Sequence, residues 1–136
     1  MNGKPFFDTH VLIYAIAAGD SRIGVARKLL AEGGVLSVQV LNEFVTVARR
    51  KYQMSWKEIR KALEDFRNLC PQIVPIVVKT HEIALRIAEQ HGYRFYDSLI
   101  IAAASEAGCH TLYSEDMHDG QTIDGLTIRN PFRTVN

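Results

Sequence analysis

Short apolar runs alternate with longer segments of helical periodicity along the whole sequence. Five runs predict strands, at residues 4–7, 35–37, 73–78, 111–114 and 126–129. Six segments with apolar positions at helical spacing predict helices, at residues 9–18, 21–32, 39–52, 55–69, 80–92 and 98–107. Strands that alternate with helices predict an α/β fold built on a mostly parallel sheet. Pro75 predicts that the third strand lies at a sheet edge, because proline cannot donate a backbone hydrogen bond.

Several predicted helices begin with residues that commonly cap helix N-termini. Ser55 and Glu58 have the spacing of a capping box at the start of the fourth helix. Thr80 is the expected cap of the fifth helix, and Asp20 or Ser21 can cap the second.

Composition indicates one ordinary globular domain over residues 1–136. The sequence is 47% hydrophobic and has a formal net charge of +1, so bulk charge does not indicate a nucleic-acid partner. No apolar run approaches membrane-spanning length, and the first residues lack the apolar core of a signal peptide. Cys70 and Cys109 have no metal-binding spacing, and two separate thiols favour a cytoplasmic location.

Four places in the sequence carry acids where a purely structural pattern would not need them. Asp8 ends an apolar strand, and Asp97 begins a very apolar helix. Glu43 interrupts the apolar face of the third helix, and the pair Glu115–Asp116 ends the fourth strand. Each has a structural alternative, since Asp8 and Asp97 can be N-caps worth about 1 kcal/mol and the others can face solvent.

Considered together, these acids predict a metal site. The carboxyl ends of parallel strands meet at one edge of a sheet, where ligands bind in such folds. Carboxylates about 6 Å apart repel by roughly 3 kcal/mol per pair at an effective dielectric constant of 20, so a cluster of them must bind protons or a cation. Oxygen ligands favour Mg²⁺ or Mn²⁺, and such an ion can activate water toward a phosphodiester.

Four blocks of the sequence resemble the PIN-domain ribonucleases, most closely the VapC-type toxins of toxin–antitoxin pairs. The blocks are Phe7-Asp8-Thr9-His10-Val11-Leu12, Leu41-Asn42-Glu43-Phe44, Phe95-Tyr96-Asp97-Ser98-Leu99-Ile100 and Leu112-Tyr113-Ser114-Glu115-Asp116-Met117. Their order and spacing agree with the family over nearly the whole chain. The resemblance implies a three-layer α/β/α sandwich with a mostly parallel sheet of four or five strands.

The resemblance also implies a function and a set of site residues. Asp8, Glu43, Asp97 and Asp116 correspond to the catalytic acids that bind Mg²⁺, with Mn²⁺ as a plausible substitute. The family cleaves RNA with metal-activated water, usually as a homodimer, and its toxins are inhibited by an antitoxin protein. Thr9, Ser114 and Glu115 are the expected supporting residues.

Two features of the site remain open in the sequence. Side chains of successive residues point apart, so only one of Glu115 and Asp116 is expected to reach the metal, and we favour Asp116. His10 stands where the family often has asparagine, and it is expected to adjust the surroundings of the metal without abolishing the site.

The densest basic run is Arg49-Arg50-Lys51, at the end of the third predicted helix. Cations at a helix C-terminus offset the helix dipole, which is the structural explanation. The functional alternative is contact with RNA phosphates, with Tyr52 available to stack on a base.

Two other function classes compete with the ribonuclease hypothesis. A PIN-fold module that binds RNA or protein without catalysis is the main alternative, although a complete set of four acids argues against it. A phosphotransfer domain is disfavoured because Thr9-His10 follows Asp8 without the second aspartate of the dehalogenase-like phosphatases, and no glycine-rich phosphate loop is present.

Overall fold

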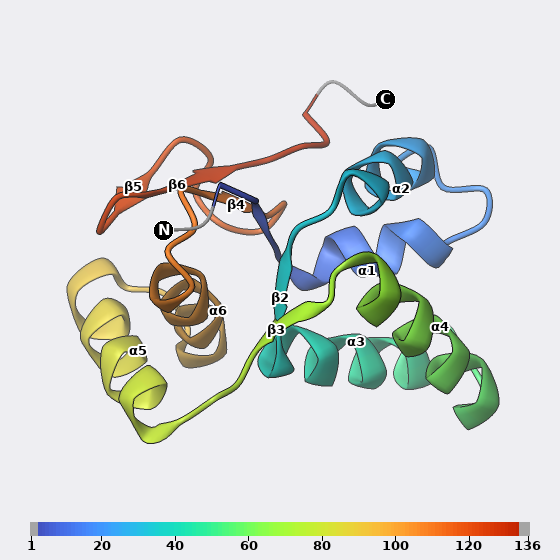
Figure 1. Ribbon diagram of the computed structural model, residues 1–136, viewed down its shortest axis with the longest axis horizontal. Coiled ribbons are helices and arrows are strands. Elements are labelled where there is room, and N and C mark those ends of the chain that lie inside the picture. Colours follow the sequence, from blue (N-terminus) through green and yellow to red (C-terminus); the bar gives the residue numbers. More distant parts are fainter. Residues whose placement is uncertain (1–2, 134–136) are drawn as a thin grey trace.

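The computed structural model describes residues 3–133 and contains a six-stranded sheet with helices on both sides (Figure 1). The strands are β1 (Phe6–Phe7), β2 (Val35–Ser37), β3 (Gln72–Val74), β4 (Thr111–Tyr113), β5 (Thr122–Ile123) and β6 (Leu126–Arg129). The helices are α1 (Thr9–Ile16), α2 (Ile23–Glu32), α3 (Val38–Arg50), α4 (Trp56–Leu69), α5 (Val78–His91) and α6 (Phe95–Glu106). The predicted α/β class and three-layer arrangement are confirmed.

Strand β1 lies in the interior of the sheet, whose strand order is β3-β2-β1-β4-β6-β5. It pairs in parallel with both β2 and β4, and its two residues, Phe6 and Phe7, are completely buried. Gly34 lies directly against this strand, since a Cβ there would be 2.3 Å from the ring of Phe7. Burial on both faces explains why β1 reads as a continuous apolar run.

The sheet has six strands, one more than the upper end of the predicted range of four or five. The additional strand, β5, has only two residues and pairs antiparallel with β6 through a turn at Asp124–Gly125. Both turn residues have positive φ angles, 50° and 82°, which suit a tight two-residue hairpin. A two-residue strand between turns is too short to produce a hydrophobic period, so the sequence pattern did not reveal it.

The helices form two groups around the central strands. Helices α5 and α6 pack together on one side, and α1 to α4 gather on the other (Figure 1). Helix α6 is buried almost all round, as its apolar sequence predicts, with all of residues 98–104 buried. The carboxyl ends of β1 and β2 lead directly into α1 and α3, which brings the start of each helix to one edge of the sheet.

Several predicted boundaries differ from the structure. Strand β3 ends at Val74, before Pro75, and α5 already begins at Val78, so Thr80 lies within the first turn and is not the N-cap. Helix α6 begins at Phe95, so Asp97 also lies in a first turn and is not a cap. Neither Asp20 nor Ser21 caps α2, because that helix begins after Arg22 without a side-chain cap.

Within residues 3–133, no helix combines the length and the apolar character needed to cross a lipid bilayer.

Candidate metal centre

Asp8 lies at the centre of the candidate site, where β1 passes into α1. Its side chain is 4% exposed and caps α1 by accepting a 2.6 Å hydrogen bond from the backbone N–H of Thr9. The neighbouring strand β4 ends beside it, and Ser114 Oγ donates a 2.7 Å hydrogen bond to Asp8 Oδ2. The predicted N-cap is therefore confirmed, but the Ser114 contact serves no capping role and holds the carboxylate at the sheet edge.

The surroundings of Asp8 make its negative charge unfavourable. The pKa of this carboxyl is raised from 3.8 to about 6, chiefly by burial and to a smaller extent by the nearby charge of Glu43. Hydrogen bonds from Ser114 and Thr9, and the proximity of His10, act in the opposite direction. A buried carboxylate with a raised pKa is stabilised either by a proton or by a cation.

Glu43 is joined to Asp8 through a shared threonine. Thr9 Oγ1 donates a 3.2 Å hydrogen bond to Glu43 Oε1, while the Thr9 backbone N–H binds Asp8. Gln39, one turn earlier in α3, donates a 3.0 Å hydrogen bond to the other oxygen, Glu43 Oε2. These bonds fix the Glu43 side chain beside the start of α1.

Asp97 lies in the first turn of α6, where the helix dipole favours an acid. Its side chain is 17% exposed and contacts Arg94, whose Nε and Nη2 atoms are both 3.4 Å from Asp97 Oδ2. Arg94 itself is 83% exposed, so this ion pair is weak and the arginine is free to change its position.

Asp116 and Glu115, adjacent in sequence, have different environments. Nδ1 of His10 lies 3.0 Å from Asp116 Oδ2, at ion-pair distance but without hydrogen-bond geometry, so this buried nitrogen has no hydrogen-bond partner in the described part of the chain. Glu115 instead accepts hydrogen bonds from Tyr14 and Arg22. Asp116 is the one of the two acids that contacts the first turn of α1.

The acids surround the edge of the sheet but are not closed around a common point. Among residues 3–133, no three histidine, cysteine, aspartate or glutamate side chains are close enough to hold one ion as they stand. Their chemistry nevertheless fits a hard divalent cation, because the donors are carboxylate oxygens and the buried Asp8 has a raised pKa. The buried Nδ1 of His10, beside Asp116, also lacks a hydrogen-bond partner in the described part of the chain, which is consistent with a site that binds a further polar group or ion.

A cavity of about 700 Å³ lies between α3 and the start of α6, with Glu43 and Asp97 in its lining. It is lined by Gln39, Asn42, Glu43, Thr46, Val47, Arg50, Arg94, Tyr96 and Asp97. We call it the acidic groove. It brings Glu43 and Asp97 together with two arginines and with Tyr96, whose side chain is 65% exposed.

The structure places the three basic residues of the 49–51 run in different environments. Arg50 lines the acidic groove. Arg49 donates a 2.9 Å hydrogen bond to the carbonyl of Met54 and lies over the Trp56 ring, 4.6 Å from its centroid. Lys51 lies 5.8 Å from the centroid of the Tyr52 ring. Only Arg50 of the three shares a cavity with the acids, a separation that sequence spacing alone could not show.

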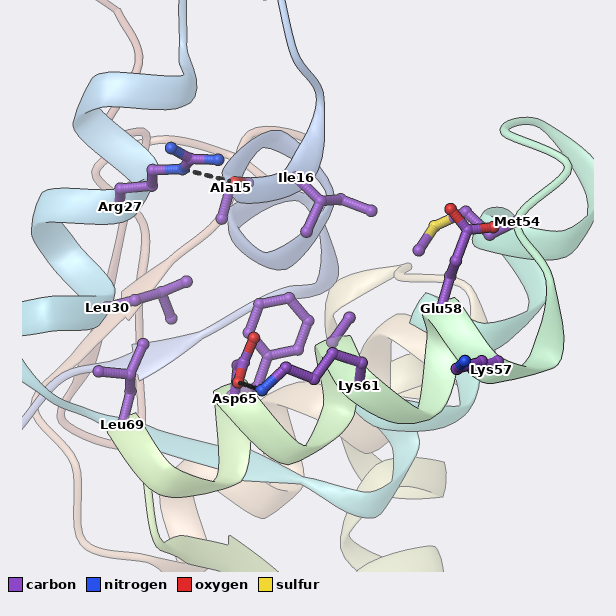
Figure 2. Close-up of a pocket in the computed structure, with 12 residues that line it drawn as sticks. Ala15, Ile16, Arg27, Leu30, Met54, Lys57, Glu58, Lys61, Asp65 and Leu69 are labelled. Carbon is purple, nitrogen blue, oxygen red and sulfur yellow. Dashed lines mark hydrogen bonds and ion pairs between the residues drawn. The ribbon is translucent and has the colours of Figure 1, made fainter.

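A second cavity, of about 710 Å³, lies between α1, α2 and α4 (Figure 2). Ile16, Leu30, Met54, Phe66 and Leu69 are among its apolar lining residues. Charged side chains lie along its rim: Arg27, Lys57, Glu58, Lys61 and Asp65. We call it the apolar groove.

Comparisons with known proteins agree with this architecture. A family model described as "PIN domain" matches residues 6–118. No curated protein matches the sequence at a significant level.

Solved structures of similar fold include three from bacterial toxin–antitoxin systems. The sarcin–ricin-loop-cleaving toxin VapC20 of Mycobacterium tuberculosis is 24% identical, with 82% of this chain and 89% of that chain covered and a TM-score of 0.68. A toxin–antitoxin complex from Klebsiella pneumoniae is 20% identical, with coverages of 93% and 97% and a TM-score of 0.69. VapBC2 from Rickettsia felis, bound to a promoter DNA fragment, is 22% identical with the same coverages and a TM-score of 0.66.

Proposed function

The chain belongs to the PIN-domain family, and we propose that it is a divalent-metal-dependent endoribonuclease that acts as the toxin of a toxin–antitoxin pair. The observation that carries the proposal is the buried Asp8, with its raised pKa, joined through Thr9 to Glu43 at the head of the acidic groove. The similarity of fold to the VapC20 toxin, which cleaves the sarcin–ricin loop, supports RNA as the substrate class.

Asp8, Glu43, Asp97 and Asp116 are the residues proposed to hold the ion, with Mg²⁺ as the physiological metal and Mn²⁺ as a substitute. A bound ion would supply an activated water and would neutralise charge at the phosphodiester. Hydrogen bonds within the chain orient two of these proposed ligands. Ser114 orients Asp8, and Thr9 and Gln39 orient Glu43, so hydrogen bonds fix these two carboxylates before an ion binds.

The acidic groove is the proposed path of the RNA strand. Arg50 and Arg94 provide positive charge along a cavity that otherwise carries Glu43 and Asp97, so phosphates can approach the acids without net repulsion. Because Arg94 only weakly contacts Asp97, it can turn toward a phosphate once a metal compensates that acid. The exposed ring of Tyr96 can stack on an unpaired base, which favours single-stranded or loop RNA.

Cleavage of a loop-containing RNA by the purified protein tests the proposal directly. We expect cleavage with Mg²⁺ or Mn²⁺, none with EDTA, and none in Asp97→Asn with either metal. Thermal unfolding with and without Mg²⁺ separates this function from a PIN-fold module that binds without catalysis. The nuclease gains stability on binding the ion, by linkage, whereas a protein that neither gains stability nor cleaves RNA contradicts the proposal.

An antitoxin is the proposed protein partner, supported by the VapBC complexes that share this fold. The apolar groove suits an amphipathic segment of such a partner, because an apolar floor lies open beneath a charged rim (Figure 2). On the rim, Lys61 and Asp65 pair with each other at 3.1 Å, and Glu58 is occupied as part of the α4 capping box. Glu58 keeps its negative charge, so Arg27, Lys57 and Lys61 face two anions, and the net charge of +1 on the rim favours acidic residues flanking the apolar face of the partner.

A homodimer in the cytoplasm completes the proposal, since the family commonly dimerises and its RNA substrates are found there. Light scattering of the purified protein over a concentration series measures the oligomeric state. A molar mass near the 15.3 kDa of one chain at all concentrations contradicts the dimer and leaves the nuclease proposal standing.

A further inference from the structure

Arg22 links the turn after α1 to the loop after β4. Its Nε and Nη2 atoms donate hydrogen bonds of 2.9 and 2.8 Å to the two oxygens of Asp20. Its Nη1 atom lies 3.0 and 3.2 Å from the two oxygens of Glu115, which is 93 residues away in the sequence. One guanidinium therefore holds two carboxylates from different parts of the chain, Asp20 in the fork geometry that suits arginine and Glu115 through Nη1 alone.

Tyr14 completes this contact from the side of α1. Its hydroxyl donates a hydrogen bond to Glu115, and the Arg22 guanidinium lies over its ring, 3.7 Å from the centroid. Burial and the bond to Glu115 raise the pKa of the Tyr14 hydroxyl, so it remains a donor throughout the physiological pH range. The ring also contacts His10 and Phe132, at centroid distances of 5.7 and 5.1 Å, which fixes its position.

These bonds hold one member of the Glu115–Asp116 pair and thereby orient the other. Glu115 is held toward α1 and the α1–α2 turn, while Asp116 is 46% exposed and contacts His10. We propose that Arg22, Tyr14 and Glu115 form an anchor that positions Asp116 at the metal centre, and that Glu115 is not a metal ligand. This inference rests on the proposed metal-dependent function and assigns positioning residues to its site.

The alternative role, Glu115 as a ligand, would require this network to break. Glu115 would have to leave three hydrogen bonds, two of them to a charged guanidinium, before it could reach an ion. Arg22 and Tyr14 would then lose an acceptor in a partly buried position. Asp116 would not have to break such bonds to reach an ion. Within residues 3–133, no arginine or lysine donates a hydrogen bond to its carboxylate.

Titration of the purified proteins with Mn²⁺, followed by calorimetry and by the electron paramagnetic resonance of the ion, tests this anchor without using activity. We expect Arg22→Gln to bind Mn²⁺ about tenfold more weakly, as is typical for residues that orient metal ligands. The direction is diagnostic, because losing a positive charge near a cation site would by electrostatics alone tighten binding. Arg22→Lys, which keeps the charge opposite Glu115, should recover most of the affinity.

Additional variants separate positioning from ligation and from a general loss of structure. Glu115→Gln should weaken Mn²⁺ binding, and the double variant with Arg22→Gln should be little weaker than either single one, because both changes break one contact. Tyr14→Phe removes a single hydroxyl and should give a smaller loss while the protein remains folded. Lys28→Gln removes the same charge from an exposed site in α2 and should leave the affinity unchanged.

The outcomes distinguish this inference from the proposed function. Wild-type protein that binds Mn²⁺, together with an Arg22→Gln variant that binds equally or more tightly, overturns the anchor and leaves the nuclease proposal intact. Wild-type protein that binds no Mn²⁺ overturns both.

Discussion

The acidic groove and the apolar groove are nearly equal in volume, about 700 and 710 Å³, but their linings are opposite in character. The acidic groove carries Glu43 and Asp97 with two arginines, whereas the apolar groove has an apolar floor and keeps its charges on the rim. Size therefore does not indicate function here, and the chemistry of the lining does. Charge and hydrogen-bonded carboxylates favour ion and phosphate binding, while an open apolar floor favours a protein segment.

The difference arises from how each groove is built. The acidic groove lies where α3 and α6 start near the sheet edge. Asp97 is in the first turn of α6, where the helix dipole stabilises negative charge, and Glu43 accepts hydrogen bonds from Thr9 and Gln39. The apolar groove lies between the sides of helices, where α4 presents Phe66 and Leu69 with Lys57 and Lys61 along its rim. Variants in one groove should therefore leave the function of the other unchanged.

The largest effect is expected from Asp8→Asn, which should reduce RNA cleavage by about three orders of magnitude or more, since it removes a proposed central ligand of the metal. Asparagine is as good an N-cap as aspartate, so α1 and the fold should persist. Single-turnover cleavage and thermal unfolding measure the two properties. Retained cleavage would show that Asp8 is not a ligand of the catalytic metal.

A pH effect of about 3 kcal/mol is expected from the same residue in the metal-free protein. The pKa of Asp8 is about 6 in the folded chain against an ordinary value of 3.8, so the folded state binds the proton more tightly. Stability should therefore increase as the pH falls from 7 toward 4, at about 1.4 kcal/mol per pKa unit. Denaturant unfolding measures it, and the wild type must be compared with Asp8→Asn because other acids titrate in this range.

Saturating Mg²⁺ should remove this pH dependence near neutrality, because the ion replaces the proton as the partner of Asp8. A wild type whose unfolding free energy follows that of Asp8→Asn at every pH would contradict the raised pKa.

Leu69→Asp should have a smaller effect, weakening the binding of the protein partner by about 2 kcal/mol, or about thirtyfold in affinity. Leu69 lines the apolar groove and is 45% exposed, so the change removes contact area at little cost to folding. The probe is the protein encoded by a short reading frame beside this gene, co-expressed and measured by calorimetry. RNA cleavage should remain at the wild-type rate.

Leu85→Asp is the matched control for this prediction, because Leu85 is 51% exposed in α5 and lies outside the groove. Equal losses in the two variants would show that the partner does not use the apolar groove.

The smallest effect distinguishes two adjacent arginines. Arg50→Gln should weaken RNA binding a few-fold and reduce the salt dependence of the binding constant by about one phosphate contact, since Arg50 lines the acidic groove. Arg49→Gln should change neither, because Arg49 is occupied by Met54 and Trp56. Fluorescence anisotropy with a catalytically inactive background measures both, and equal slopes would place the RNA elsewhere.

The sequence predicted the fold wherever local signals and tertiary packing agree. The capping box at Ser55 and Glu58 and the strand at residues 126–129 are confirmed by the structure. The predicted strand over residues 76–78 is wrong. The β-branched side chains there favour a strand, yet Val78 begins α5 and is largely exposed. Local propensity is weak there, and the packing of the helix decides the boundary.

The candidate site was less accessible to sequence reasoning wherever it depends on long-range contacts. Strand ends led to Asp8 and Asp116 being expected at one edge, whereas the supporting role of Ser114, which the structure shows bonded to Asp8, came only from the family resemblance. The Arg22–Glu115 contact could not be predicted, since Arg22 lies in a turn without any motif and pairs with a residue 93 positions away. The sequence also does not show which residue of the basic run 49–51 lines the groove, because that depends on the direction of each side chain.

The pairing of β1 with β4 has a consequence for the synthesis of the protein. Phe6 and Phe7 pair with Leu112 and Tyr113, so the edge that carries Asp8 is completed only by residues near the other end of the chain. A nascent chain that has emerged only as far as α5 still lacks Asp97, Ser114 and Asp116. The proposed toxin should therefore remain harmless on the ribosome until late in translation, whereas the helices of the apolar groove, all within residues 9–69, emerge early. An antitoxin could thus engage its surface before the nuclease site is assembled.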